Sequence, residues 1–150
     1  AHEWGRAPEG DRQAAERRQP RGVRAPAPDI AARAGLSHLV LPFERASIRP
    51  MPAVLTNLLG NRISAITLHS VVLVDPDRYE EMVEGGDRTL FAHELIHVAQ
   101  WHAEGPGRFL YRYATDYLRL RCFGLDHHTA YRHIGYEWDA YEQSARLTAN

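Results

Sequence analysis

The sequence is poor in the features that build disulfide-rich or membrane-spanning proteins. It has one cysteine, Cys122, and no lysine, so all 18 basic residues are arginine. A single cysteine excludes an internal disulfide, and we expect Cys122 to pack as a small apolar side chain. The longest apolar run, Val71–Val74, is far shorter than the roughly 20 residues of a membrane-spanning helix. No apolar segment near residue 1 has the form of a secretion signal, and we expect no membrane insertion.

Positive and negative charges nearly cancel. The 18 arginines are matched by 19 acidic residues, for a formal net charge of −1. Such a balance gives no bulk attraction to nucleic acid or to an anionic membrane surface. We therefore expect no nucleic-acid partner. Because no secretion signal is seen, the location stays open between the cytoplasm and export by a non-classical route. A chain of 150 residues favours a single domain.

Residues 1–29 are predicted to be a disordered or loosely attached leader. They contain four prolines and six arginines and have few large apolar side chains. A linker, a basic arm and a pro-region that covers an active site are alternative interpretations of this segment. The domain itself is predicted over residues 30–150.

The domain is predicted to combine a small sheet with several helices. Helices are predicted over 30–36, 52–59, 79–83, 88–104, 109–122, 127–133 and 137–147. His38–Phe43 is predicted as a short strand, and residues 63–74 as a strand pair with a turn or bulge at His69–Ser70. The fold class is α+β: a small, mainly antiparallel sheet of two to four strands packed on a bundle of about four helices.

Residues 91–99 carry the strongest chemical signal. On a helix, one turn separates His93 from His97, so the two imidazoles point the same way. Two neutral imidazoles at this spacing can hold a zinc ion, and Glu94 between them can act on the water that the metal activates. Asp87 provides a helix N-cap, and a Gly-Pro-Gly sequence ends the helix. The pattern predicts a metal-binding helix.

Chance is a weak explanation for this pattern. The composition predicts roughly 0.04 accidental His-Glu-x-x-His matches in a chain of this length. The spacers Leu95 and Ile96 are apolar, which gives the low-dielectric wall that such a site needs. The alternative is a pair of hydrogen-bonded histidines on a buried helix with no metal.

A catalytic zinc site takes a third protein ligand and keeps one position open. His102 is near in sequence but lies on a different side of the helix from His97. Glu104 lies two turns beyond His97, and Asp116 lies among tyrosines and arginines. Glu137 opens the final helix between aromatic residues, where an unpaired carboxylate is costly. We expect Glu137 to be the third ligand; the alternative is a carboxylate favoured by the helix dipole.

His93-Glu94-x-x-His97 with a downstream Glu137 resembles the gluzincin zinc metallopeptidases. More narrowly, residues 62–100 resemble the metallopeptidase domain associated with bacterial extracellular contractile injection systems. The matching features are a strand pair, Asp75-Pro76, a short spacer and the segment Leu90–Gln100.

The resemblance implies a minimal zincin-like domain with Zn²⁺ as its cofactor. It implies metal ligation by His93, His97 and Glu137, and it makes Glu94 the general base. Tyr141 stands where several of these families carry an acid, so Asp139 or Asp116 becomes the candidate for a hydrogen bond to a ligand histidine.

Hydrolysis also needs a donor for the developing oxyanion. The candidates, in order, are Tyr141, Tyr136, His133 and the His127–His128 pair. We predict a zinc metallopeptidase, specifically an endopeptidase, that acts on a peptide or protein and is associated with a larger secretion or toxin assembly.

Two other functions are compatible with the sequence. One is a zinc-bearing docking module that does not cleave. The other is a self-processing peptidase of narrow specificity, whose target would be residues 1–28.

Overall fold

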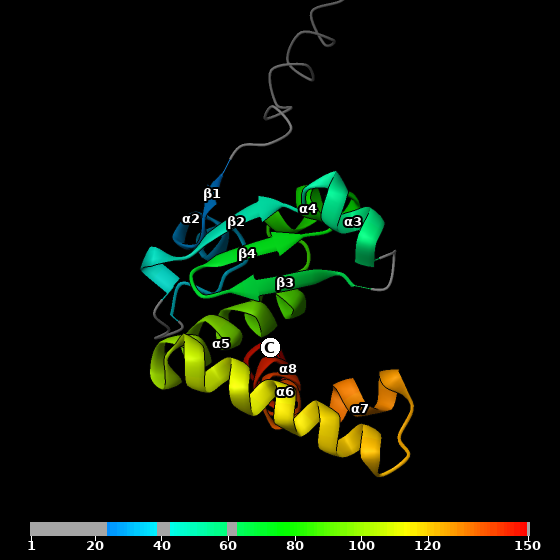
Figure 1. Ribbon diagram of the computed structural model, residues 1–150. Helices are drawn as coiled ribbons and strands as arrows, with labels where there is room; N and C mark the ends of the chain where they lie inside the picture. The colour runs from blue at the N-terminus through cyan, green and yellow to red at the C-terminus, as the bar shows by residue number, and fades with distance from the viewer. Residues whose placement is uncertain (1–23, 39–42, 60–62, 150) are drawn as a thin grey trace, which may run out of the picture.

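The computed structural model describes residues 24–38, 43–59 and 63–149, which form an α+β fold as predicted. The elements, in chain order, are β1 (Ala25–Pro26), α2 (Ala27–Arg33), the 3₁₀ helix η1 (Phe43–Arg45), β2 (Ser47–Pro50), α3 (Ala53–Leu59), β3 (Ala65–Leu68), β4 (Val71–Val74), α4 (Pro76–Val83), α5 (Arg88–Glu104), α6 (Pro106–Cys122), α7 (His127–His133) and α8 (Gly135–Leu147). Helices α5 to α8 lie together below the sheet, α3 and α4 lie at its upper right, and α2 lies beside β1 and β2 (Figure 1).

The sheet has four strands in the order β1-β2-β4-β3. The two outer pairings, β1 with β2 and β3 with β4, are antiparallel, whereas the central pairing of β2 with β4 is parallel. The prediction of a mainly antiparallel sheet thus holds for two pairings of three. The parallel pairing arises because α3 and β3 intervene between β2 and β4, so the chain crosses over before β4 joins the sheet.

The predicted strand pair is confirmed as a tight hairpin. Leu68 pairs with Val71, which leaves His69 and Ser70 as the loop. His69 has a φ of 58°, the left-handed conformation that a two-residue hairpin loop requires. Strand β3 forms one edge of the sheet and lies next to α5.

The N-terminal boundary of the folded elements differs from the predicted one. The expected break after residue 29 lies inside α2, and β1 already pairs with β2 at Ala25. Ala27 and Ile30 are completely buried, so this segment is part of the core and its apolar burial contributes to stability. Residues 1–23 of the predicted leader lie outside the described residues.

The strand predicted over His38–Phe43 is not formed at either end. His38 lies in a turn and Phe43 begins η1; residues 39–42 lie outside the described part of the chain. The strand that pairs with β4 is Ser47–Pro50 instead. Pro50 and Pro52 lower the strand propensity of this segment. The segment nevertheless forms a strand because it pairs in parallel with β4.

Helix α5 is the central element of the fold. The Asp87 side chain accepts a hydrogen bond from the backbone N–H of Leu90 and so caps its start, as predicted. Every residue of Phe91–Val98 is buried. A helix that is buried on all sides must be covered by several neighbours, and α5 packs against β3, α6 and, most extensively, α8.

The packing prediction for Cys122 in helix α6 is wrong. Cys122 is exposed rather than packed. Phe109 is the buried residue of this helix, and its ring stacks on Trp101 of α5 at a centroid distance of 4.5 Å. In the described part of the chain, no helix has the length and apolar character needed to cross a bilayer.

We predict that Gly85→Ala destabilises the protein by about 2 kcal/mol or more. Gly85 has a φ of 85°, and an added Cβ would lie 2.7 Å from backbone atoms of Arg33 and Ala34. Chemical denaturation measures the free energy of unfolding. The control is Gly107→Ala in α6, where no atom lies within 4 Å of the added carbon; equal stability of the two variants would contradict the prediction.

Candidate metal centre

The fold brings His93, His97 and Glu137 to one point. His93 Nε2 and His97 Nε2 are 3.1 Å apart, and each lies 3.2 Å from Glu137 Oε2. The exposed fractions of the three residues are 6%, 5% and 2%. The two histidines come from successive turns of α5, and the glutamate comes from the first turn of α8, which packs across α5. The predicted third ligand is therefore brought to the predicted pair.

The arrangement requires a positive charge between the three atoms. Their lone pairs converge in a site that water reaches poorly, so they repel one another unless a proton or a cation lies between them. Burial acts to lower the pKa of His97, but the hydrogen bond to Glu137 and the charges of Glu94 and Glu137 outweigh it and raise that pKa to about 9. Burial acts to raise the pKa of Glu137, but its hydrogen bonds to the two histidines hold that pKa well below its usual value. The group could hold a metal ion.

Gln100 fixes the orientation of His97. Gln100 Oε1 lies 2.8 Å from His97 Nδ1, and Gln100 Nε2 donates to Tyr136 O at 3.0 Å and to Asp139 Oδ2 at 3.1 Å. Because the amide nitrogen is occupied as a donor, the amide oxygen accepts a proton from Nδ1. His97 Nε2 then faces Glu137, as the atom that carries a proton or can bind a metal ion.

Neither Asp139 nor Asp116 makes the direct hydrogen bond to a ligand histidine that we expected. Asp139 supports His97 indirectly, through Gln100, whereas Asp116 accepts from the backbone N–H of Gly135 at 3.3 Å. His93 Nδ1 is buried and has no hydrogen-bond partner among the described residues. The ring of Tyr141 covers His93 at a centroid distance of 4.5 Å.

Glu94 is buried beside His97 and Glu137 and is held by the sheet. The Thr67 hydroxyl on β3 donates to Glu94 Oε2 at 2.6 Å, and Glu94 has an exposed fraction of 5%. This bond occupies one carboxylate oxygen and fixes the carboxylate plane relative to the two histidines.

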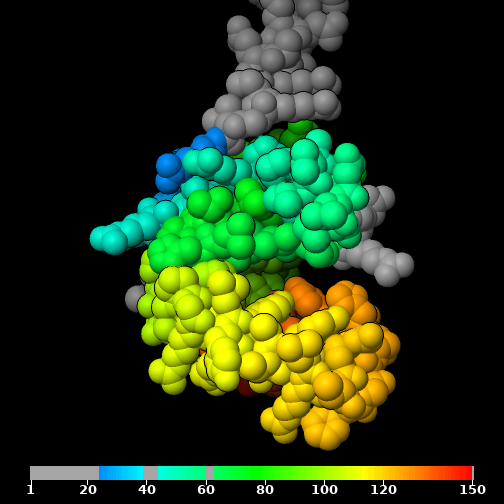
Figure 2. Space-filling view, in the orientation of Figure 1, coloured from blue at the N-terminus to red at the C-terminus, as the bar shows by residue number. Residues whose placement is uncertain are grey.

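A cleft of about 260 Å³ opens onto this group between β3, α5, α6 and α7. Its lining residues are Ile63, Ala65, Ile66, Thr67, Leu68, Glu94, His97, Trp101, Phe109, Leu110, Tyr113, Tyr131 and Glu137. The surface is hollowed between the sheet and α6 (Figure 2). Most of these side chains are apolar, so the polar groups of the site lie at the base of an apolar cleft.

Two tyrosines in the cleft were missed by the sequence analysis. The Tyr113 hydroxyl donates to Glu137 Oε1 at 2.8 Å, and Tyr131 lines the same cleft. Burial, assisted by neighbouring groups that include Glu137, raises the pKa of both tyrosines far above the usual value. Both hydroxyls therefore keep their protons at neutral pH and can donate. Only the tertiary packing of α6 and α7 over α5 identifies them.

The donors predicted from sequence lie elsewhere. Tyr141 and His133 line a separate, more open hollow of about 490 Å³ between α7 and α8, which does not include Glu94 or Glu137. His133 Nδ1 is 2.8 Å from the backbone oxygen of Thr129. The structure thus brings Tyr141 against a metal ligand but does not bring His133 into the cleft.

The remaining candidates are also separate from the group. Tyr136 stacks on Phe109 at 4.6 Å. His127 Nδ1 lies 2.8 Å from the Tyr117 hydroxyl, and His128 lines the outer hollow. Glu104 pairs with Arg108 and Arg112 on the surface.

Comparison with known proteins gives one match. Residues 42–105 match the family model described as the eCIS core domain, which links the chain to extracellular contractile injection system proteins. This segment is less than half of the chain; it contains His93, Glu94 and His97 but ends before Glu137. Its description names no activity. No curated protein and no solved structure matches the chain.

We predict that Gln100→Ala weakens metal binding about 10- to 100-fold, because His97 loses the group that orients it. Zinc affinity is measured by competition with a chromophoric chelator. Gln143→Ala is the matched control, since Gln143 also bonds Asp139 but not a histidine. Equal affinity of the two variants would show that Gln100 has no orienting role.

Proposed function

We propose that the chain is a zinc-dependent peptidase of the gluzincin type that cleaves within peptides or proteins. The observation that carries this proposal is the position of Glu94. Its carboxylate is held by Thr67 at the base of an apolar cleft, directly beside His93, His97 and Glu137. A structural metal site needs no such carboxylate facing a cleft, whereas metal-assisted hydrolysis does.

Zinc fits the donor set. Two imidazoles and one carboxylate are the ligands of many catalytic zinc sites, and bonds of about 2.0–2.1 Å in a tetrahedral site place ligand atoms roughly 3.3 Å apart. The separations of 3.1 and 3.2 Å are close to this value. A zinc ion bound here supplies Lewis-acid polarisation of the scissile carbonyl and of the attacking water.

Glu94 is proposed to move the proton. It accepts a proton from the attacking water and delivers that proton to the leaving amine, which is the usual task of a general base and acid. Thr67 donates to one oxygen of Glu94, so the other oxygen remains for the water. The low exposure of Glu94 keeps bulk water from competing for the carboxylate.

Tyr131 and Tyr113 are proposed as the donors to the developing oxyanion. Both line the cleft, and both keep their protons because burial raises their pKa. Tyr113 donates to Glu137 Oε1, and Tyr131 interacts with both Glu137 and Tyr113, so the two hydroxyls form one donor pair beside the proposed metal ligand. Tyr141, the first choice from sequence, faces the other hollow.

The free edge of β3 is proposed to bind the substrate backbone. β3 pairs only with β4 in the described part of the chain. Ser64 O accepts a hydrogen bond from Asp75 N, and because ladder bonds alternate along an antiparallel pair, the backbone groups of Ala65 and Thr67 face away from β4. An extended peptide that pairs there lies beside Glu94.

The match to the eCIS core domain supports a place beside a larger assembly. We propose that the substrate, or a docking partner, is a protein of such a system. The competing function is a zinc-bearing module that does not cleave. The effect of substituting Glu94 on cleavage distinguishes the two functions.

We predict that Glu94→Gln lowers turnover by at least about 100-fold while zinc stays bound, because the amide cannot accept the proton. A library of peptides is incubated with the zinc-loaded chain, and cleavage is read by mass spectrometry alongside metal analysis. Glu142→Gln on the α8 surface is the control. Undiminished cleavage by Glu94→Gln would remove the proposed base, and no cleavage by the unmodified chain would favour the docking module.

We predict that Thr67→Val lowers kcat about tenfold or more with little change in KM, because a misplaced base acts only on the chemical step. Steady-state kinetics on a cleaved peptide give both constants. Thr67→Ser keeps the hydroxyl and should restore most of the activity. A loss confined to KM would instead place Thr67 in substrate binding.

A further inference from the structure

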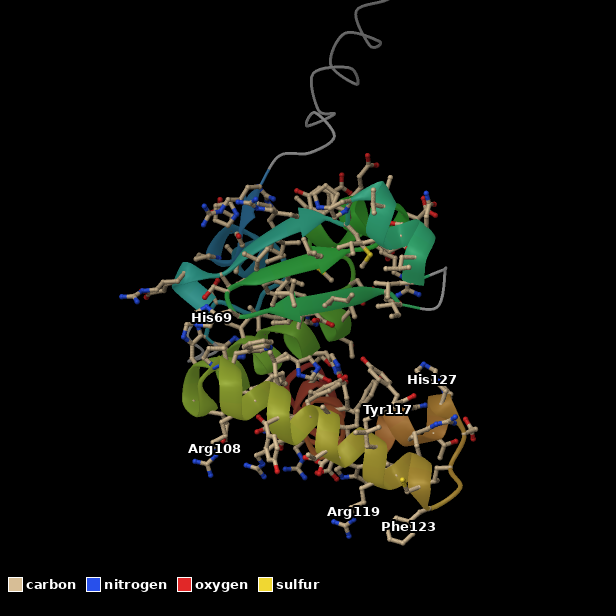
Figure 3. All side chains as sticks on the ribbon, in the orientation of Figure 1. His69, Arg108, Tyr117, Arg119, Phe123 and His127 are labelled. Carbon is tan, nitrogen blue, oxygen red and sulfur yellow. The ribbon has the colours of Figure 1, made fainter. Side chains whose placement is uncertain are left out.

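A second pair of histidines meets on the surface, apart from the buried group. His69 in the β3–β4 loop and His102 near the end of α5 have ring centroids 4.4 Å apart. Both residues are exposed, and neither lines the cleft. His69 lies at the end of the molecule opposite His127 (Figure 3). The two residues are 33 positions apart in sequence, so the fold, and not local sequence, brings them together.

Both rings point a nitrogen at the same oxygen. Ser70 Oγ lies 3.1 Å from His69 Nδ1 and 2.9 Å from His102 Nε2. The hydroxyl has one proton and can donate to only one of these nitrogens, so the other ring must donate its own N–H. Two convergent imidazole nitrogens and a hydroxyl oxygen are a chelating set for a metal ion that prefers nitrogen.

The hairpin does not require a histidine at this position. His69 is the one non-glycine residue with positive φ in the described part of the chain, at a loop position where glycine or asparagine carries less strain. Its ring, however, reaches His102 and packs edge-on near Trp101 at 6.4 Å. The side chain therefore makes interactions that the turn alone does not explain.

The local charge keeps His102 neutral but limits the affinity for a cation. Burial, together with the nearby His69 and Arg45, lowers the pKa of His102, so its nitrogen lone pair is available at neutral pH. The Arg45 charge also repels a cation, and the site offers no carboxylate within the triad. A metal bound here is held more weakly than one at His93, His97 and Glu137.

We propose that His69, Ser70 and His102 form a second, exposed binding site for a divalent transition metal such as Zn²⁺ or Cu²⁺. The site is independent of the proposed peptidase activity. Copper should bind more tightly than zinc, following the general order of affinity for nitrogen ligands.

The test is calorimetric titration of Zn²⁺ into the full chain already loaded with one equivalent of zinc. We expect a second, weaker binding event that becomes at least tenfold weaker in His69→Ala and in His102→Ala. His127→Ala, which removes another exposed histidine, should keep the event unchanged. The proposal would be overturned if the second binding event persists in both His69→Ala and His102→Ala. It would also be overturned if the unmodified chain shows no second event.

A second measurement uses the unmodified chain, so its result does not depend on whether the variants keep the hairpin structure. With zinc in the buried site, substoichiometric Cu²⁺ should broaden the ring ¹⁵N signals of His69 and His102 before those of any other histidine. Broadening that begins at His127 or His128 would assign the weak binding elsewhere.

Discussion

Three lone-pair atoms meet at the centre of this protein within 3.2 Å of one another, and the rest of the fold is arranged around that contact. Burying the Glu137 carboxylate, which is 2% exposed, is unfavourable unless hydrogen bonds and a positive charge compensate. The compensation comes from His93, His97 and Tyr113. The same three atoms could hold a cation in place of the proton.

The residues that hydrogen-bond to the site residues and fix their positions come from separate parts of the chain. Thr67 on β3 holds Glu94, Tyr113 on α6 holds Glu137, and the α8 residue Asp139 holds Gln100. The site therefore forms only when the sheet and the C-terminal helices are both in place. The match to the eCIS core domain ends at residue 105, so the third ligand and both cleft tyrosines lie on helices outside the matched segment.

The predicted fold was right where local signals were strong. Asp87 caps α5 as predicted, and the β3–β4 hairpin turns at His69–Ser70. It was wrong where the structure of a segment depends on contacts with residues distant in sequence. β1 and the start of α2 look like leader sequence, yet pairing with β2 and complete burial of Ala27 make them part of the domain. Composition cannot show that an alanine-rich segment fits a cavity left by other elements.

The sequence by itself determined that His93 and His97 lie together with Glu94 next to them, because the geometry of one helix fixes how residues one turn apart are placed. It also favoured Glu137, since a carboxylate among aromatic residues needs a partner. Only the tertiary structure decided which hydroxyls enter the cleft. Tyr113 and Tyr131 face it while Tyr141 and His133 face the outer hollow, because that choice depends on how α6, α7 and α8 pack against α5, and no local pattern encodes the packing of separate helices.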